Sequence, residues 1–160
     1  MASVKLAYGT STAITITLNS LASAVGSARE SLVVSAQSTD LNLDAMVYVA
    51  AELITGTPAS DKQVNVYAYG SEDGTNYTDN ATGADTTLTL RSPTNLRLMG
   101  VIAMPDSGGL QYKGGPWSVA SAFGGILPRK WGIVVENRTS LAFESSGCSA
   151  SYTGVYATVA

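Results

Sequence analysis

The stretch Val64-Asn65-Val66-Tyr67-Ala68-Tyr69 alternates small apolar residues with larger polar or aromatic ones. Successive side chains of a β-strand point to opposite faces of the sheet, so Val64, Val66 and Ala68 would share one face. A period of two is typical of a strand and does not fit the 3.6-residue period of a helix. The sequence therefore predicts a β-strand at this position.

Strand signals of the same kind recur along the chain. Thr12–Leu18 repeats the alternation, with isoleucine and leucine on one face and threonine on the other. Ala45–Ile54 is β-branched enough for a strand, although its Ala-Glu-Leu content leaves a helix open. The other predicted strands are Arg29–Ala36, Thr86–Leu90, Leu96–Met104, Trp117–Phe123, Trp131–Val135, Leu141–Phe143 and Ser151–Val159.

Turn-forming residues separate these segments, notably in Gly56–Asp61 and in the long loop Pro105–Pro116. The only helical candidate is Ser20–Glu30, and it contains Gly26, which costs a helix about 1 kcal/mol. Short strands at this spacing predict an all-β fold, a jelly-roll-like antiparallel β-sandwich of about eight strands. We expect a single domain over residues 1–160, with residues 1–10 forming either an N-terminal arm or the first strand of the same sheet.

The composition narrows the classes of partner. Charged residues make up 13% of the 160 residues, about half the usual share, and the net charge is −3. The nine Lys and Arg are scattered, so we expect no nucleic acid partner, because phosphate binding needs a basic face. The sequence shows no secretory signal and no apolar run of the ~20 residues that a membrane span needs, so we expect assembly in the cytoplasm and no membrane partner.

Catalytic and metal-binding patterns are not found in the sequence. Histidine is absent, which removes the commonest general base and metal ligand, and Cys148 is the only cysteine. The loop Glu72–Asp79 carries several oxygen ligands that calcium would accept, but the EF-hand order is missing and a solvated loop is favoured. We therefore predict no enzyme activity, no catalytic residues, no cofactor and no metal site.

Four segments in the C-terminal 60% of the chain carry a resemblance to a known group of proteins. Together they resemble small virion proteins of tailed bacteriophages, whose members are often capsid decoration, or cement, proteins with a jelly-roll-like sandwich. The segments are Val66-Tyr67-Ala68-Tyr69-Gly70-Ser71-Glu72-Asp73-Gly74, Leu96-Arg97-Leu98-Met99-Gly100-Val101-Ile102, Gly115-Pro116-Trp117-Ser118-Val119-Ala120-Ser121-Ala122-Phe123-Gly124-Gly125 and Leu127-Pro128-Arg129-Lys130-Trp131-Gly132-Ile133-Val134-Val135.

The resemblance implies a structural virion protein on the capsid surface. Such a protein would bind between subunits of the phage major capsid protein and would itself form a homo-oligomer. Alternatives are a tail, neck or head-fibre protein, or a carbohydrate-binding module that attaches the particle to its host. We expect the contacts in residues 2–10, where alternating side chains could add an edge strand to a partner, and in the loops Gly70–Asn80 and Pro105–Gly115. The interface residues predicted in these segments are Val4, Leu6, Tyr8, Asp73, Tyr77, Leu110 and Tyr112.

Overall fold

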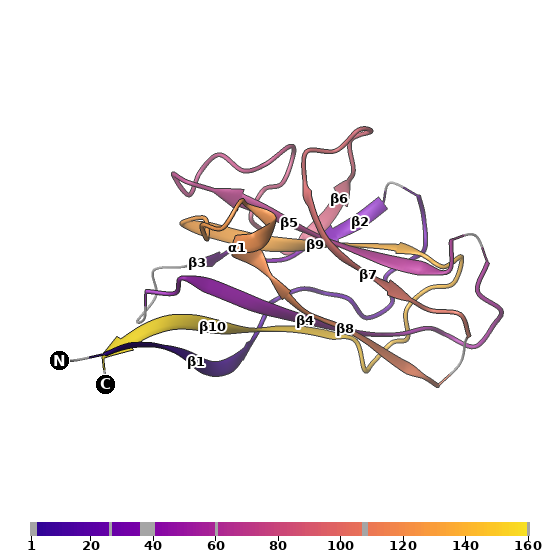
Figure 1. The fold of residues 1–160 in the computed structure, drawn as a ribbon. Coiled ribbons are helices and arrows are strands. Elements are labelled where there is room, and N and C mark those ends of the chain that lie inside the picture. The colour runs from indigo at the N-terminus through magenta and orange to yellow at the C-terminus, as the bar shows by residue number, and fades with distance from the viewer. Residues whose placement is uncertain (1–2, 26, 36–40, 60, 107–108, 160) are drawn as a thin grey trace.

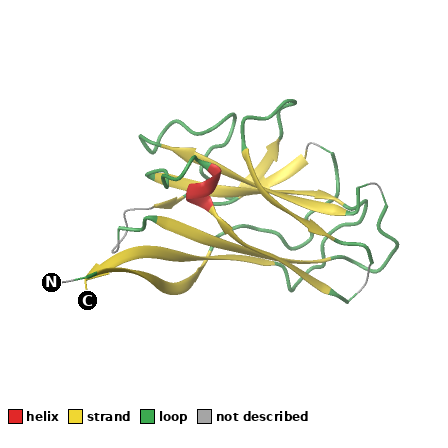
Figure 2. Ribbon diagram, viewed as in Figure 1, coloured by secondary structure: helices red, strands yellow, loops and turns green. Residues whose placement is uncertain are grey.

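The computed structural model describes residues 3–25, 27–35, 41–59, 61–106 and 109–159. Two antiparallel sheets face each other, and one short helix lies in one of the connections between them (Figures 1 and 2). The first sheet has the order β1 (Val4–Ala13), β10 (Ser149–Val159), β4 (Asp44–Glu52) and β8 (Gln111–Ser118). The second has the order β6 (Thr86–Thr89), β2 (Ser27–Glu30), β9 (Lys130–Arg138), β5 (Gln63–Ser71) and β7 (Arg97–Ala103), with β3 (Val34–Ser35) also paired to β9.

The strand order is that of a jelly roll. The short strands β2 and β3 both pair with β9 and together act as one interrupted strand. With β6 set aside, each sheet then has four strands, in the orders β1-β10-β4-β8 and β2/β3-β9-β5-β7. This is the eight-stranded double Greek key, so the predicted all-β class and jelly-roll-like sandwich are confirmed. The strand β6 lies in the connection between β5 and β7.

The core fills the space between the two sheets. Val64, Val66 and Ala68 share the inner face of β5 and are fully buried, opposite the inner face of β4. Tyr69 lies on the other face of β5 and is also buried, because the segment 72–96 folds over that side of the sheet. Val64, Val66 and Ala68 therefore line the main core between the sheets, and Tyr69 belongs to a second, smaller core on the outer side of β5.

The strand predicted at Thr12–Leu18 is wrong after Ala13, where β1 ends. The predicted faces are nevertheless kept, since Ile14 and Leu18 are buried and the two threonines are exposed. The backbone leaves β10 here and finds separate partners: Leu32 donates to the carbonyl of Thr15, and Thr17 donates to Asp85. An alternating pattern thus predicts which side of an extended segment is buried. It does not predict that the segment is part of a sheet, because that also requires a neighbouring strand to hydrogen-bond with.

Other boundaries also differ from the prediction. The segment predicted as a possible helix, Ser20–Glu30, ends in the strand β2, whose pairing with β6 and β9 outweighs local helix preference. The segment predicted at Ala45–Ile54 is a strand as far as Glu52, where β4 ends, so its helical alternative is wrong. Leu141–Phe143 forms one isolated bridge to Leu53 and no strand. Of the strand predicted at Arg29–Ala36, only β2 and β3 form, and Ala36 lies outside the described residues.

The segment Trp117–Phe123 is a strand only as far as Ser118, and the helix α1 (Val119–Ala122) follows. Ser118 caps this turn by accepting a hydrogen bond from the Ser121 amide, at 2.9 Å. Asp44 holds the same turn to β4, because it accepts hydrogen bonds from the Ser118 hydroxyl and the Ala120 amide. The long loop predicted at Pro105–Pro116 is shorter than expected, since β8 begins at Gln111.

Candidate interaction surface

The strands β1 and β10 form a ribbon that extends past the rest of the sandwich, with both chain ends at its tip (Figure 1). Val4 pairs with Val159, Leu6 with Ala157 and Tyr8 with Val155, and the register shifts after Tyr8. Residues 4–13 are thus the edge strand of the chain's own sheet, and residues 1–2 lie outside the described part.

One face of this ribbon is apolar and open to solvent. Directly opposite residues of an antiparallel pair, and every second residue along a strand, point to the same side. The side chains of Val4, Leu6, Tyr8, Ala157 and Val159 therefore form one stripe, which we call the ribbon face, and Val155, opposite Tyr8, is buried at its base. Val4, Leu6, Tyr8 and Val159 are 72%, 66%, 69% and 70% exposed. Exposed apolar groups gathered in this way are typical of a contact surface.

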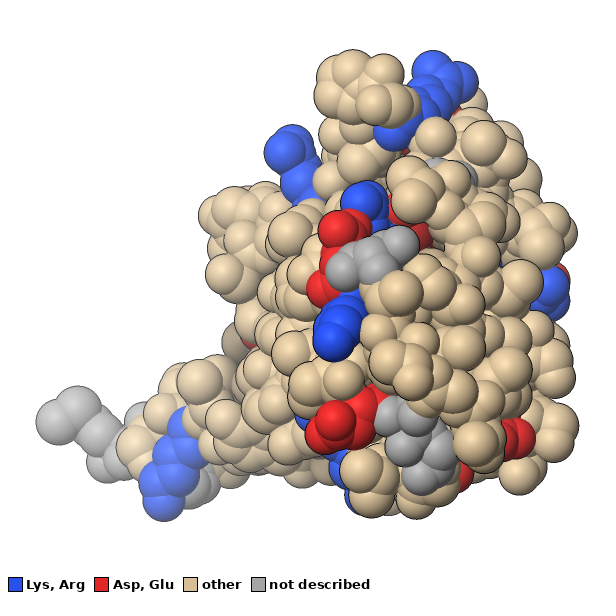
Figure 3. Space-filling view, turned by 90° about the vertical axis from the view of Figure 1, so that its right-hand side faces the viewer, with Lys and Arg blue, Asp and Glu red and all other residues tan. Residues whose placement is uncertain are grey.

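The ribbon is also almost uncharged. Lys5 is the only charged residue in β1, and β10 contains no Lys, Arg, Asp or Glu. Figure 3 shows one face of the whole molecule, on which few side chains carry charge. A partner covering the ribbon would therefore displace little tightly bound water from charged groups.

The edges of the two sheets differ in how well they are protected. At one side, β7 and β8 lie against each other and bring the two sheets together. The edge strand β6 has only four residues. The edge of β1 is ten residues long and, among the described residues, no further strand pairs with it. Native proteins normally blunt such an edge with charges or bulges. In β1 the one charge is Lys5 and the register shift comes after Tyr8, so Val4–Tyr8 remains a regular edge to which a partner strand could pair.

The predicted loop residues lie away from the ribbon face. Asp73 is bound within its own loop: one carboxylate oxygen accepts hydrogen bonds from the amides of Thr75 and Asn76 and from Ser71, and the other accepts from the Asn76 side chain. These hydrogen bonds, led by the amide of Asn76, hold the pKa of Asp73 well below its usual range. The carboxylate thus shapes the loop, and its hydrogen-bond capacity is largely used.

The three other predicted interface residues are spread over the molecule. Tyr77 packs edge-on against Tyr69, with 5.7 Å between the ring centroids, and is half-buried. Tyr112 packs against the main core from β8. Leu110 is 53% exposed and directly precedes β8, a strand that begins at the end of the sandwich opposite the ribbon tip (Figure 1). The structure brings together Val4, Leu6 and Tyr8, and it does not bring the loop residues to them.

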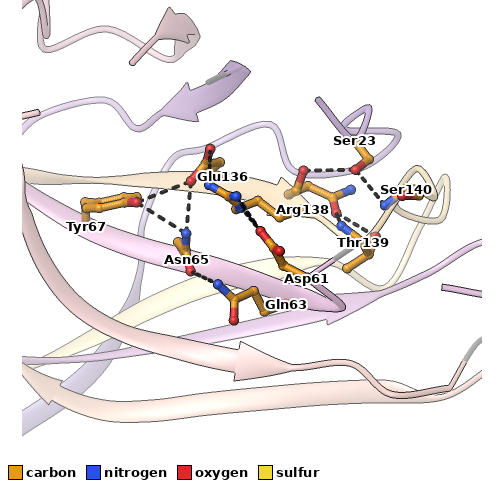
Figure 4. A network of polar contacts seen from close by, with 10 residues as sticks. Ser23, Asp61, Gln63, Asn65, Tyr67, Glu136, Arg138, Thr139 and Ser140 are labelled. Carbon is orange, nitrogen blue, oxygen red and sulfur yellow. Dashed lines mark hydrogen bonds and ion pairs between the residues drawn. The ribbon is translucent and has the colours of Figure 1, made fainter. Parts of the chain in front are cut away.

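A partly buried polar network, centred on the buried Glu136, crosses the outer face of the second sheet (Figure 4). The carboxylate of Glu136 accepts hydrogen bonds from the Asn65 amide at 3.0 Å and the Tyr67 hydroxyl at 3.2 Å. Arg138 lies 3.6 Å from its other oxygen and also binds Asp61. Burial, followed by the negative charge of Glu136, raises the pKa of Tyr67. The network was not predicted from the sequence, although the polar run Glu136-Asn137-Arg138 directly follows the predicted apolar strand Trp131–Val135 and was a visible signal.

This network links β5 to β9 and to Asp61 ahead of β5, so it stabilises the second sheet. Within the described ranges, no three His, Cys, Asp or Glu side chains lie close enough to hold a metal ion. No described helix is long and apolar enough to cross a membrane. The surface that the geometry singles out is therefore the ribbon, with its apolar face and its open edge.

A shallow hollow lies on the outer face of the first sheet. It is lined by Tyr48, Lys113, Ser149 and Ser151, among others, and Tyr48 is 46% exposed. An exposed aromatic ring beside hydroxyl groups and an amine can stack against and hydrogen-bond a polar ring. The two tryptophans do not contribute here, because Trp131 is buried and Trp117 packs against the core.

Comparison of the chain with known protein families, with curated proteins and with solved structures finds no match in any of the three.

Proposed function

We propose that this chain is a structural protein of a bacteriophage virion that decorates the capsid and stabilises it by binding between subunits of the major capsid protein. The observation that carries the proposal is the ribbon face, an apolar, nearly uncharged surface that projects from the sandwich. The likeness of the four sequence segments to small phage virion proteins supports the same role.

The physical basis of such a role is contact energy added between neighbouring shell subunits. Burying apolar surface contributes about 25 cal/mol per Å², so the ribbon face supplies a modest energy per copy. A particle carries many equivalent junctions, and ligands that bind only the assembled shell shift its stability by mass action. Many weak contacts can therefore raise the resistance of the whole shell.

The proposal is tested by mixing the purified protein with mature capsids that lack it, sedimenting them and counting bound copies per shell. Saturation at hundreds of copies, with a raised temperature of capsid disruption, is the expected result. Binding of about a dozen copies or fewer would instead place the protein at a tail, neck or fibre position, where fewer equivalent sites exist.

A second candidate function is carbohydrate binding during host attachment, which the hollow beside Tyr48 favours. In that case the protein would bind defined sugars on a glycan array, and Tyr48→Ala would abolish the signal. Retained sugar binding in Tyr48→Ala would remove this candidate, and capsid binding would be unchanged by the same substitution.

A further inference from the structure

The tip of the ribbon is exposed on both faces, which is unusual for two strands. Within the described part of the chain, Val4–Tyr8 pairs only with residues 155–159, and most of these side chains are half or fully exposed. A two-stranded ribbon in water is at best marginally stable without a third strand or a covering surface. We therefore expect a further contact, at the edge of the ribbon, on its face or at both, to stabilise it.

We propose that the edge of β1 pairs with β1 of a second copy, in antiparallel orientation about a two-fold axis at Leu6. The inference goes beyond the capsid role and does not rest on it. The pairing would join the two first sheets into one continuous eight-stranded sheet.

The position of the axis follows from the register of β1. The strand is regular from Val4 to Tyr8, and the register with β10 shifts between Tyr8 and Ser11. A bulge re-aims the backbone and ends regular pairing, so the regular part is the part available to a partner. Its centre is Leu6, and antiparallel pairing about that centre places Val4 opposite Tyr8 of the second copy.

The side chains of β1 suit a copy of themselves. Leu6 would lie opposite Leu6 of the second copy, and Val4 would lie opposite Tyr8 of the second copy. Both apolar pairs are favourable across two strands. Lys5 would lie opposite the small Ala7, so the two lysines of the dimer are not directly paired. The edge carries one lysine and no acidic group, so a second copy of this nearly uncharged strand can pair with it without placing like charges directly opposite each other.

Pairing at the edge leaves the ribbon face open and doubles its width. Because the face is perpendicular to the hydrogen-bonding direction, the stripes of the two copies would lie side by side. Five regular residues per copy are far fewer than the ~20 to 30 per side of a standard interface. We therefore expect a weak, reversible dimer whose population rises with concentration.

The test uses the full chain without capsids, so its failure leaves the capsid proposal standing. Sedimentation velocity over a range of protein concentrations should show a monomer–dimer equilibrium. Leu6→Asp should weaken the dimer by ~10-fold or more, because two like charges would face each other at the axis. A chain that stays monomeric up to millimolar concentration would overturn the proposal.

Disulfide trapping in a Cys148→Ser background tests the register. Leu6→Cys should cross-link to itself on mild oxidation, since opposite residues of paired strands lie within disulfide reach. Tyr8→Cys is the matched control, because it is similarly exposed on the same strand and face, yet two copies would lie about 13 Å apart along the strands. A mixture of Val4→Cys and Tyr8→Cys should cross-link. Equal self-linking of Leu6→Cys and Tyr8→Cys would indicate random collision and contradict the pairing.

Discussion

The indole ring of Trp117 occupies the space into which a side chain at position 100 would project. Gly100 is on β7 and Trp117 is on β8, so this contact joins the two sheets along one side of the sandwich. A Cβ built at Gly100 would overlap the indole ring. The side formed by β7 and β8 is thereby closed, and β1 at the other end of the first sheet remains open.

Gly100→Ala should therefore destabilise the protein by about 1 to 3 kcal/mol, the usual cost of overpacking a filled site. The measurement is urea unfolding followed by tryptophan fluorescence. Gly9→Ala is the control, since a Cβ there meets its nearest neighbour at an ordinary 3.6 Å. Equal stability of Gly100→Ala and the unaltered protein would show that the indole can move aside.

Acid should weaken the hydrogen bonds between Asp85 and Thr17, which hold the segment that follows β1. Asp85 accepts hydrogen bonds from the Thr17 amide at 2.9 Å and from Arg29 at 2.6 Å. Burial alone would raise the pKa of Asp85, but the hydrogen bonds from Arg29 and Thr17 outweigh it and lower that pKa. A carboxylate with a lowered pKa stabilises the fold above its unfolded pKa of about 3.9, and this contribution is lost as the pH falls through the folded value.

The free energy of unfolding should therefore differ between the unaltered protein and Asp85→Asn most at about pH 7 and least near pH 2. Urea titrations at several pH values measure this difference. A difference that stays constant from neutral to acid pH would show that Asp85 acts without its charge.

The sequence predicted the sandwich because its inward residues alternate, as Val64, Val66 and Ala68 do, and the main-core strands follow that rule. It did not predict where Thr12–Leu18 leaves the sheet, since hydrogen-bond partners such as Asp85 are far away in sequence. The exposed alternation of Val4, Leu6 and Tyr8 was visible as a surface signal. The sequence could not show whether Tyr77 and Tyr112 contact a partner or pack inside the protein. Only the fold shows that each packs against a hydrophobic core.

Removing the cation beside Glu136 should destabilise the second sheet. Glu136 is almost fully buried, and Arg138 is the cation 3.6 Å from its carboxylate. Breaking a buried ion pair from one side costs about 3 to 5 kcal/mol, because it leaves a charge with less compensation. The partial exposure of Arg138 argues for the lower end of that range in Arg138→Met.

Adding Glu136→Gln to Arg138→Met should recover part of the loss, since the buried group is then neutral. Thermal unfolding of the two single variants and the double variant gives the coupling. The exposed Arg129→Met serves as the control for losing an arginine. Additive losses in the double variant would contradict an interaction between Arg138 and Glu136.

Cys148 should react slowly with thiol reagents at neutral pH. Burial raises the pKa of its thiol, and the Glu52 amide lies 3.4 Å from the sulfur. Because the thiolate is the reactive form, alkylation by iodoacetamide should be slower in the folded protein than in urea and should accelerate above about pH 9. Equal rates in the folded and unfolded protein would show that the thiol is freely accessible.

Capsid binding and strand pairing can be separated within the ribbon. Val159 belongs to the ribbon face but lies on β10, one strand in from the edge that pairs in the proposed dimer. Val159→Asp should therefore lower capsid occupancy at least ~10-fold by burying an unpaired charge, while the monomer–dimer equilibrium changes little. The matched control is Val25→Asp, which substitutes a similarly exposed valine, 75% against 70%, outside the ribbon. Equal capsid binding by Val159→Asp and Val25→Asp would exclude the ribbon face as the capsid contact, and it would leave the pairing of β1 to be judged by its own cross-linking result.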